Sequence, residues 1–232
     1  MDAASLDHSI HLWLIRHKDL ADETPEHPIC LSETERERAG RLRSETARAR
    51  FVATRVWLRG LLGHYLNTDA RDIDWEHNAH GKPRLAGQAE DQGLVFNLSH
   101  TGDYAALALT RDGRLGVDIE LPKASRDLEG LAAMCLAPEE LSWWREGAED
   151  EKAANFFRLW VCKEAYVKAV GRGIALGLKR IAVKPDFSGF LRLPPEYGTP
   201  EAWHMYESHH GPCRLALVHE GEARPITVFA SS

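Results

Sequence analysis

The sequence predicts an α+β protein with antiparallel sheets, because helical stretches and short hairpin-forming strands occupy separate parts of the chain. Apolar residues recur at helical spacing between residues 32 and 66 and again between 151 and 170, which predicts helices. Three short apolar runs lie between these stretches, and Asp112-Gly113, a pair typical of hairpin turns, joins the last two. The 232 residues are 44% apolar and 28% charged, which is ordinary for a globular protein.

Two amphipathic helices are expected before residue 67. The first begins near Ser32, because Ser32 and Glu35 form the S-x-x-E pattern of a capping box, and the second covers about residues 45–66. This stretch carries eight arginines: Arg36, Arg38, Arg41, Arg43, Arg48, Arg50, Arg55 and Arg59. We expect most of them to form a solvated helix face and a minority to point at an anionic ligand.

The strands and the second helical region come next. Apolar runs at residues 94–98, 104–110 and 115–120 predict three strands, and the polar residues 99–103 predict a loop between the first two. A long helix is expected over about residues 151–170, because Gly171 follows it as a C-terminal glycine does. Short strands and loops are expected from residue 181 onward.

Composition argues against several classes of protein. No apolar run approaches the ~18 residues of a membrane-spanning helix, and the first ten residues lack the basic and apolar regions of a signal peptide. The four cysteines are scattered without CxxC spacing, which favours a reducing, cytoplasmic location. The net charge of −6 argues against nucleic-acid binding.

Acidic side chains on the third strand and on the long helix are candidate metal ligands. Side chains alternate along a strand, so Asp118 and Glu120 share one face. They are either two solvated acids at a strand edge or a site for a hard cation such as Mg²⁺. Glu164 and Lys168 are four residues apart and share a helix face, either as an ordinary ion pair or as contacts to a metal and a phosphate.

Two further motifs precede these acids. Gly81-Lys82-Pro83 taken alone is a surface turn, and His100 in Phe96-Asn97-Leu98-Ser99-His100 taken alone is a structural histidine that could donate to an anion. The order of the motifs along the chain is more specific than any one motif. With Gly116-Val117-Asp118-Ile119-Glu120 and residues 160–168, WVCKEAYVK, the four motifs resemble the series of Sfp-type 4′-phosphopantetheinyl transferases.

The resemblance, which covers about residues 31–180, implies a fold and a reaction. The family fold is a pseudo-dimer of two similar α+β halves, each an antiparallel sheet packed by a helix. We therefore expect halves at residues 1–113 and 114–232, with the active site between them. The reaction transfers the 4′-phosphopantetheine group of coenzyme A to a serine of a carrier protein and releases adenosine 3′,5′-bisphosphate.

The resemblance also implies a role for each matching residue. The expected Mg²⁺ ligands are Asp118, Glu120 and Glu164. Lys168 would contact the pyrophosphate, and Glu164 is the candidate base; with Asp118 these form the expected catalytic set. The expected contacts around the 3′-phosphate of coenzyme A are Arg50, Lys82, Ser99 and His100, with Arg38 as a further basic contact.

The expected partner is an apo acyl or peptidyl carrier protein with an acidic, helical contact surface, and the chain is expected to act as a monomer without nucleic acid or membrane. Residues 121–145 offer an apolar docking patch or, equally, core residues: Met134, Leu136, Leu141, Trp143 and Trp144. The alternatives are a non-catalytic coenzyme A or nucleotide-binding module on the same fold, and a metalloprotein built on histidines: His77, His80, His209 and His210.

Overall fold

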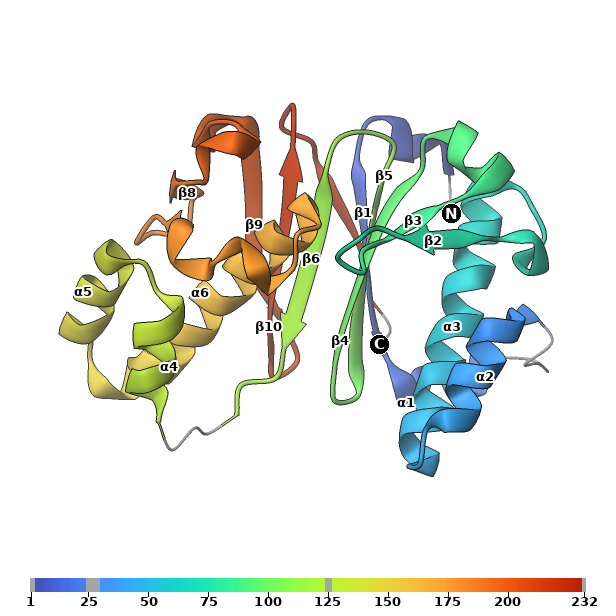
Figure 1. Ribbon diagram of the computed structural model, residues 1–232, viewed down its shortest axis with the longest axis horizontal. Coiled ribbons are helices and arrows are strands. Elements are labelled where there is room, and N and C mark those ends of the chain that lie inside the picture. The colour runs from blue at the N-terminus through green and yellow to red at the C-terminus, as the bar shows by residue number, and fades with distance from the viewer. Residues whose placement is uncertain (1–2, 24–29, 124–126, 231–232) are drawn as a thin grey trace.

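The computed structural model describes residues 3–23, 30–123 and 127–230, so residues 124–126 of the expected docking segment lie outside the description. Two α+β halves lie side by side, each a sheet with one long helix on its outer face (Figure 1). The helices are α1 His17–Glu23, α2 Glu33–Arg41, α3 Glu45–Leu66, α4 Leu128–Cys135, α5 Pro138–Glu146 and α6 Glu149–Val170. The strands are β1 Ile10–Arg16, β2 Trp75–His77, β3 Pro83–Leu85, β4 Val95–Thr101, β5 Tyr104–Thr110, β6 Leu115–Glu120, β7 Ala182–Val183, β8 Phe190–Arg192, β9 Trp203–His210, β10 Cys213–Glu220 and β11 Ile226–Ala230.

The two larger of the four described sheets make the inner layers of the molecule. The first has the strand order β11-β1-β5-β4 and the second β6-β10-β9. Leu12 of the first sheet and Val117, Ile119 and Leu217 of the second belong to one apolar core between the sheets. Helix α3 covers the other face of the first sheet and α6 that of the second, so the layers run helix, sheet, sheet, helix (Figure 1).

Local sequence accounts for the helices that carry the site. Ser32 caps α2, and Ser32 and Glu35 make both bonds of the expected capping box. Helix α3 has the expected bounds, with Ser44 as its N-cap. Helix α6 begins two residues before the expected start, and Gly171 ends it with a positive φ of 75°.

Strand β4 is longer than expected. The polar residues 99–101, predicted as part of a loop, continue the strand, because β4 stays paired with β5 as far as Thr101 opposite Tyr104. Only Gly102 and Asp103 form the turn, and Gly102 supplies its positive φ of 54°. Ser99 and His100 therefore lie on a strand and point to opposite faces.

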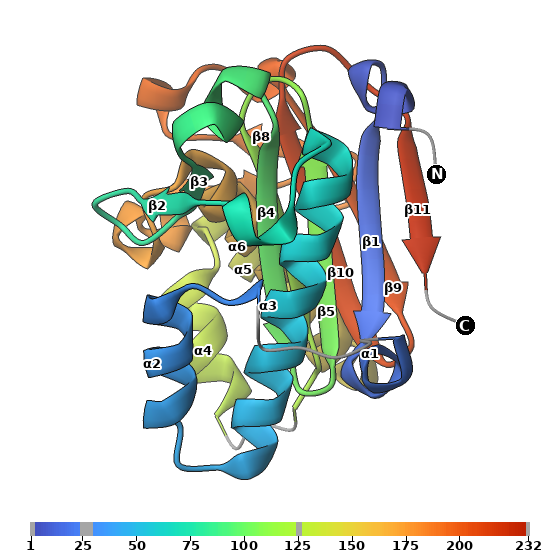
Figure 2. The same cartoon turned by 90° about the vertical axis from the view of Figure 1, so that its right-hand side faces the viewer.

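The last strand returns to the first sheet. β11 pairs with β1, and the two strands run in the same direction (Figure 2). The antiparallel prediction holds for the other pairs of the described sheets, and this one pair is parallel. The first sheet thus combines residues from both expected halves.

The apolar residues of the segment 121–145 are divided between core and surface. Leu136 and Trp144 are buried, and Leu141 and Trp143 pack partly buried against the same core. Met134 on α4 is the member of the set that is exposed, at 72%. Core packing therefore accounts for four of the five residues that were candidates for a docking patch.

Within the described ranges, no helix combines the length and the hydropathy that a bilayer crossing requires.

Candidate active site between the two halves

Strand β6 and helix α6 bring the predicted acids and Lys168 together. Lys168 donates from Nζ to Asp118 Oδ1 at 2.6 Å and to Ser99 Oγ at 2.7 Å. Ser99 Oγ in turn donates to Asp118 Oδ1 at 2.9 Å. Asp118 on β6, Lys168 on α6 and Ser99 on β4 thus meet where the two halves join.

Gly116 allows this close approach of β6 to α6. A Cβ atom at this position would lie 2.0 Å from the carbonyl oxygen of Ala165 and 2.4 Å from the amide nitrogen of Ala169. Glycine is the residue without that atom, so the strand can rest directly on the helix backbone. Alternation along β6 places Asp118 and Glu120 on the same face as Gly116, toward the helix that carries Glu164.

Glu164 lies in a negative and poorly hydrated environment. It is 9% exposed, and its Oε1 has no hydrogen-bond partner. Burial raises its pKa to about 7, and the charges of Asp118 and Glu120 add to the shift while Lys168 opposes it. Burial also raises the pKa of Glu120, again with a contribution from Asp118. The three carboxylates are therefore close enough to repel one another.

The donor atoms of these acids suit a hard cation, although they do not form a coordination sphere here. Asp118 Oδ2 and Glu164 Oε1 are buried without hydrogen-bond partners. Carboxylate oxygens with missing partners are what Mg²⁺ would use. Among the described residues, however, no three His, Cys, Asp or Glu side chains are arranged as a metal site, and that includes the four histidines considered above.

A cationic cavity of about 380 Å³ lies on the other side of β4, between that strand and helices α1 to α3. Its polar lining consists of His17, Arg38, Arg50, Thr54, Arg55 and His100. Desolvation lowers the pKa of His100, and the positive charges of His17, Lys168, Arg55 and Arg38 lower it further. The charge of Lys168, which contacts Asp118, thus acts on His100, so the cavity and the acidic cluster are coupled electrostatically.

Two of the predicted phosphate contacts line this cavity beside His100. Arg50 forms an ion pair with Asp103 of the β4–β5 turn. The guanidinium of Arg38 lies over the Phe51 ring, 5.3 Å from its centroid. His17 was not singled out in the sequence; its Nε2 is 2.7 Å from Thr54 Oγ1.

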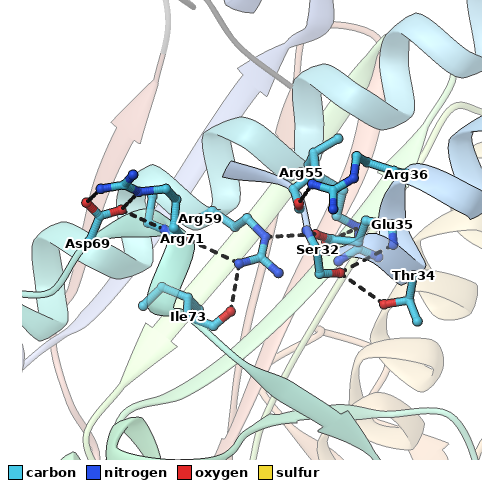
Figure 3. Close-up of polar contacts among 11 residues, drawn as sticks. Ser32, Thr34, Glu35, Arg36, Arg55, Arg59, Asp69, Arg71 and Ile73 are labelled. Carbon is cyan, nitrogen blue, oxygen red and sulfur yellow. Dashed lines mark hydrogen bonds and ion pairs between the residues drawn. The ribbon is translucent and has the colours of Figure 1, made fainter. Parts of the chain in front are cut away.

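Two further arginines of α3 pair with Glu35 of α2. Arg59 is buried, and its Nε donates to Glu35 Oε2 at 2.7 Å while Nη1 donates to the carbonyl oxygen of Ile73 at 2.7 Å (Figure 3). Arg55 pairs with the other oxygen of Glu35 at 3.7 Å. A solvated helix face is therefore the wrong description for Arg59, because Glu35 reaches it from the neighbouring helix.

Lys82 is not brought to the cationic cavity. Its Nζ donates to the carbonyl oxygens of Leu115 at 2.9 Å and Ala169 at 2.8 Å, near the C-terminus of α6. Asn78 of the same hairpin donates to the carbonyl oxygen of Gly171 at 2.9 Å. Burial lowers the pKa of Lys82 to about 8. The hairpin between β2 and β3 therefore fastens the end of α6 to the first half.

Ser99 is also turned away from the cationic cavity. Odd-numbered residues of β4 face β6, whereas Phe96, Leu98 and His100 face α3 or the cavity beside it. Thr101, which sequence reasoning missed, contacts Glu120 in the same way that Ser99 contacts Asp118. Polar residues at positions 97, 99 and 101 would have predicted a strand with one polar face, but residues 99–103 were interpreted as a loop.

Comparison with known proteins gives a consistent result. A family model described as the 4'-phosphopantetheinyl transferase superfamily matches residues 114–227, and a second, described as the N-terminal part of 4'-phosphopantetheinyl transferases, matches residues 22–111. The 4'-phosphopantetheinyl transferase HetI of Nostoc sp. is 35% identical over 203 residues, which are 87% of this chain and 83% of the relative.

More distant relatives carry related names. The 4'-phosphopantetheinyl transferase ffp of Bacillus subtilis is 27% identical over 191 residues, covering 82% of this chain and 83% of the relative. The human L-aminoadipate-semialdehyde dehydrogenase-phosphopantetheinyl transferase is 30% identical over 155 residues, covering 63% of this chain and 50% of the relative.

Proposed function

The chain belongs to the 4'-phosphopantetheinyl transferase superfamily, and we propose that it transfers the 4′-phosphopantetheine group of coenzyme A to a serine of an apo carrier protein. The observation that carries this proposal is that a cationic cavity lies on one side of β4 and an acidic cluster on the other. One face contributes His100 to a cavity lined by arginines, and the other contributes Ser99 to the acidic cluster. A substrate with a terminal phosphate and a central pyrophosphate can use both.

The cationic cavity supports binding of the 3′-phosphate of coenzyme A. We assign this contact to Arg38, Arg50 and His100, and we add His17 because it lines the same cavity. Lys168 is assigned to the pyrophosphate, since its ammonium group donates to Asp118 of the acidic cluster. We leave Lys82 and Ser99 out of the phosphate contacts, because their polar atoms are used at the join between the halves.

Mg²⁺ fits the acidic cluster by the chemistry of its donors. Asp118, Glu120 and Glu164 would hold it, and two buried carboxylate oxygens without partners support that assignment. The ion would supply positive charge beside the pyrophosphate, where negative charge grows in the transition state.

The chemical step forms one bond and breaks one. The serine Oγ of the carrier attacks the β-phosphorus of coenzyme A, and the bond from that phosphorus to the oxygen of adenosine 3′,5′-bisphosphate breaks. We assign Glu164 as the acceptor of the hydroxyl proton, because its buried Oε1 lacks a hydrogen-bond partner and can accept one. Lys168 stabilises the charge on the departing phosphate.

An acidic, helical carrier surface, a monomeric state and a cytoplasmic location stay predictions. Exposed apolar side chains on α4, Leu131 and Met134, support docking of a partner with an apolar contact next to the charged one. The division into halves at residues 113 and 114 is likewise a prediction.

The experiment that tests the function is incubation with coenzyme A, Mg²⁺ and a panel of apo carrier proteins, followed by intact-mass measurement. We expect the mass of at least one carrier to rise by that of the phosphopantetheine group. Coenzyme A binding without a mass gain on any carrier would favour the alternative, a non-catalytic binding module.

Asp118→Asn tests the acidic cluster within the same assay. It removes one negative charge but keeps the size of the side chain, so we expect transfer to fall by about 100-fold or more. Asp112→Asn is the matched control, because Asp112 is largely exposed and pairs with Arg224 far from the cluster. Equal rates for the two variants would contradict the assigned role of Asp118.

A further inference from the structure

β4 and β6 are neighbouring edge strands that do not form a common sheet. β4 is the last strand of the first sheet, and β6 is the first strand of the second. Three backbone N–H groups of β6 and the residue after it donate to side chains of β4 instead. Val117 donates to Asn97 Oδ1 at 2.8 Å, Ile119 to Ser99 Oγ at 3.4 Å, and Leu121 to Thr101 Oγ1 at 3.3 Å.

These contacts repeat at every second residue of both strands. A strand presents an outward N–H at every second position, and β4 points a polar side chain at three successive ones, those of residues 117, 119 and 121. The side chains of Asn97, Ser99 and Thr101 thus replace the backbone carbonyls that a paired strand would offer. We call these three residues the seam residues.

The two hydroxyl groups among the seam residues each make a second contact. Ser99 donates to Asp118 Oδ1 at 2.9 Å, and Thr101 donates to Glu120 Oε1 at 3.2 Å. A hydroxyl has one proton and two lone pairs. Because its oxygen accepts a backbone N–H, its single proton is directed at the carboxylate next to that N–H.

Ser99 uses its full capacity. Its oxygen accepts from the amide of Ile119 and from Lys168 Nζ, and its proton goes to Asp118. Asn97 accepts from the amide of Val117, and the residue before Val117 is Gly116, which has no carboxylate to hold. Hydroxyl residues therefore occur at the two seam positions beside which an acid stands.

We propose that Ser99 and Thr101 are positioning residues that hold one oxygen each of Asp118 and Glu120 and so orient these carboxylates toward a divalent cation. Asp118 Oδ2, the oxygen that Ser99 does not hold, is the buried atom without a partner. This inference rests on the proposed function, because it assigns the acids to a cation. It extends the site to a strand from the opposite half.

The test measures binding of Mn²⁺ alone to the full chain, by electron paramagnetic resonance or calorimetry, without coenzyme A. Removing a group that orients a metal ligand weakens metal affinity by about 10- to 100-fold. We expect that loss for Ser99→Ala and for Thr101→Val, which keeps the shape of threonine without its hydroxyl. Thr101→Ser restores the hydroxyl and should recover most of the affinity.

Asn97→Ala is the matched control for a purely structural role. It removes a seam contact that has no acid beside it, so it should lower the melting temperature but leave Mn²⁺ affinity within about 2-fold, since no group that orients a metal ligand is lost. If Asn97→Ala weakens Mn²⁺ binding as much as Ser99→Ala, the seam residues act only through stability and the inference is wrong. Unchanged affinity in Thr101→Val overturns it as well.

The two proposals fail separately. If the wild-type chain binds Mn²⁺ and Thr101→Val weakens that binding, the positioning role stands even when no carrier gains mass. If carriers gain mass while the hydroxyl variants bind Mn²⁺ normally, the transferase stands and the positioning role is rejected. A wild-type chain that binds no Mn²⁺ also rejects it.

Discussion

Helix α6 carries two lysines that each pair with a carboxylate, and the two pairs differ in their exposure and in their hydrogen-bond partners. Lys163 pairs with Glu140 at 2.5 Å, and both side chains are 0% exposed. Lys168 pairs with Asp118 at 2.6 Å, at the join between the halves. Five residues separate the two lysines, so they point to different sides of the helix.

The inner pair has a hydrogen-bond partner for each charged group. Lys163 also donates to the carbonyl oxygens of Cys135 and Leu178. Glu140 accepts from the amides of Ala137 and Val183 through its two oxygens. This arrangement joins α5, α6 and β7 in one polar network inside the core of the second half.

At the outer pair, Asp118 and the neighbouring Glu164 each have an oxygen without a hydrogen-bond partner. Asp118 Oδ2 and Glu164 Oε1 are buried without partners, and Glu164 carries a raised pKa. Burying a polar atom without a hydrogen bond costs free energy, so such an atom beside other acids is a candidate for contact with a ligand. The carboxylates of these two pairs are both buried, and they differ in whether each oxygen has a hydrogen-bond partner.

The largest effect is expected at the inner pair. Lys163→Met leaves Glu140 buried without its counter-charge, and we expect the free energy of unfolding to fall by about 3–5 kcal/mol. Chemical denaturation of the wild type and of Lys163→Met measures this difference in the free energy of unfolding.

Replacing both partners, as in Lys163→Met with Glu140→Leu, should recover much of that loss, because two apolar side chains need no counter-charge. If Lys163→Met alone is as stable as the wild type, the inner pair is not the structural pair that this comparison requires.

The next effect is a pH dependence at Glu164. Its folded-state pKa lies near 7, above the ordinary value of 4.5, so the folded chain keeps a proton that the unfolded chain has lost between these pH values. The free energy of unfolding therefore falls as pH rises through this window, by at most about 3 kcal/mol from this group. Glu164→Gln should abolish that part of the fall.

Denaturation curves at pH 4.5 and pH 8, without metal, measure this difference. Glu149→Gln is the control, because Glu149 is an exposed glutamate on the same helix. Added Mg²⁺ should flatten the wild-type profile, since a cation offsets the repulsion among the three acids. A wild-type profile that Glu164→Gln leaves unchanged would show that Glu164 is not held in a negative environment.

The smallest effect on stability is expected at the outer pair. Lys168→Met should cost about 1 kcal/mol, because this lysine is partly exposed and its partner keeps the bond from Ser99. Transfer to a carrier should nevertheless fall strongly. A loss of stability as large as that of Lys163→Met would show that the two pairs play the same role.

Sequence periodicity predicted the parts of this site that lie within one element. The two-residue period of β6 placed Asp118 and Glu120 on one face, and the helical period of α6 placed Glu164 and Lys168 on another. Both predictions concern neighbours along the chain, for which the backbone geometry alone decides the direction.

Contacts between distant segments could not be predicted in the same way. The carbonyl oxygens that bind Lys82 come from Leu115 and Ala169, and nothing in the motif Gly81-Lys82-Pro83 specifies them. The partner of Arg59, Glu35, lies on another helix. Ser99 was predicted to lie in a loop because residues 99–103 are polar, whereas pairing of β4 with β5 determines its extended conformation.

The pairing of β11 with β1 has a consequence for how the chain folds. β1 leaves the ribosome well before its parallel neighbour β11, because residues 17–225 lie between the two strands. A fold with such distant contacts completes late. Until residue 226 emerges, one edge of β1 lacks its neighbour and can pair with another nascent chain, so we expect truncated forms to aggregate.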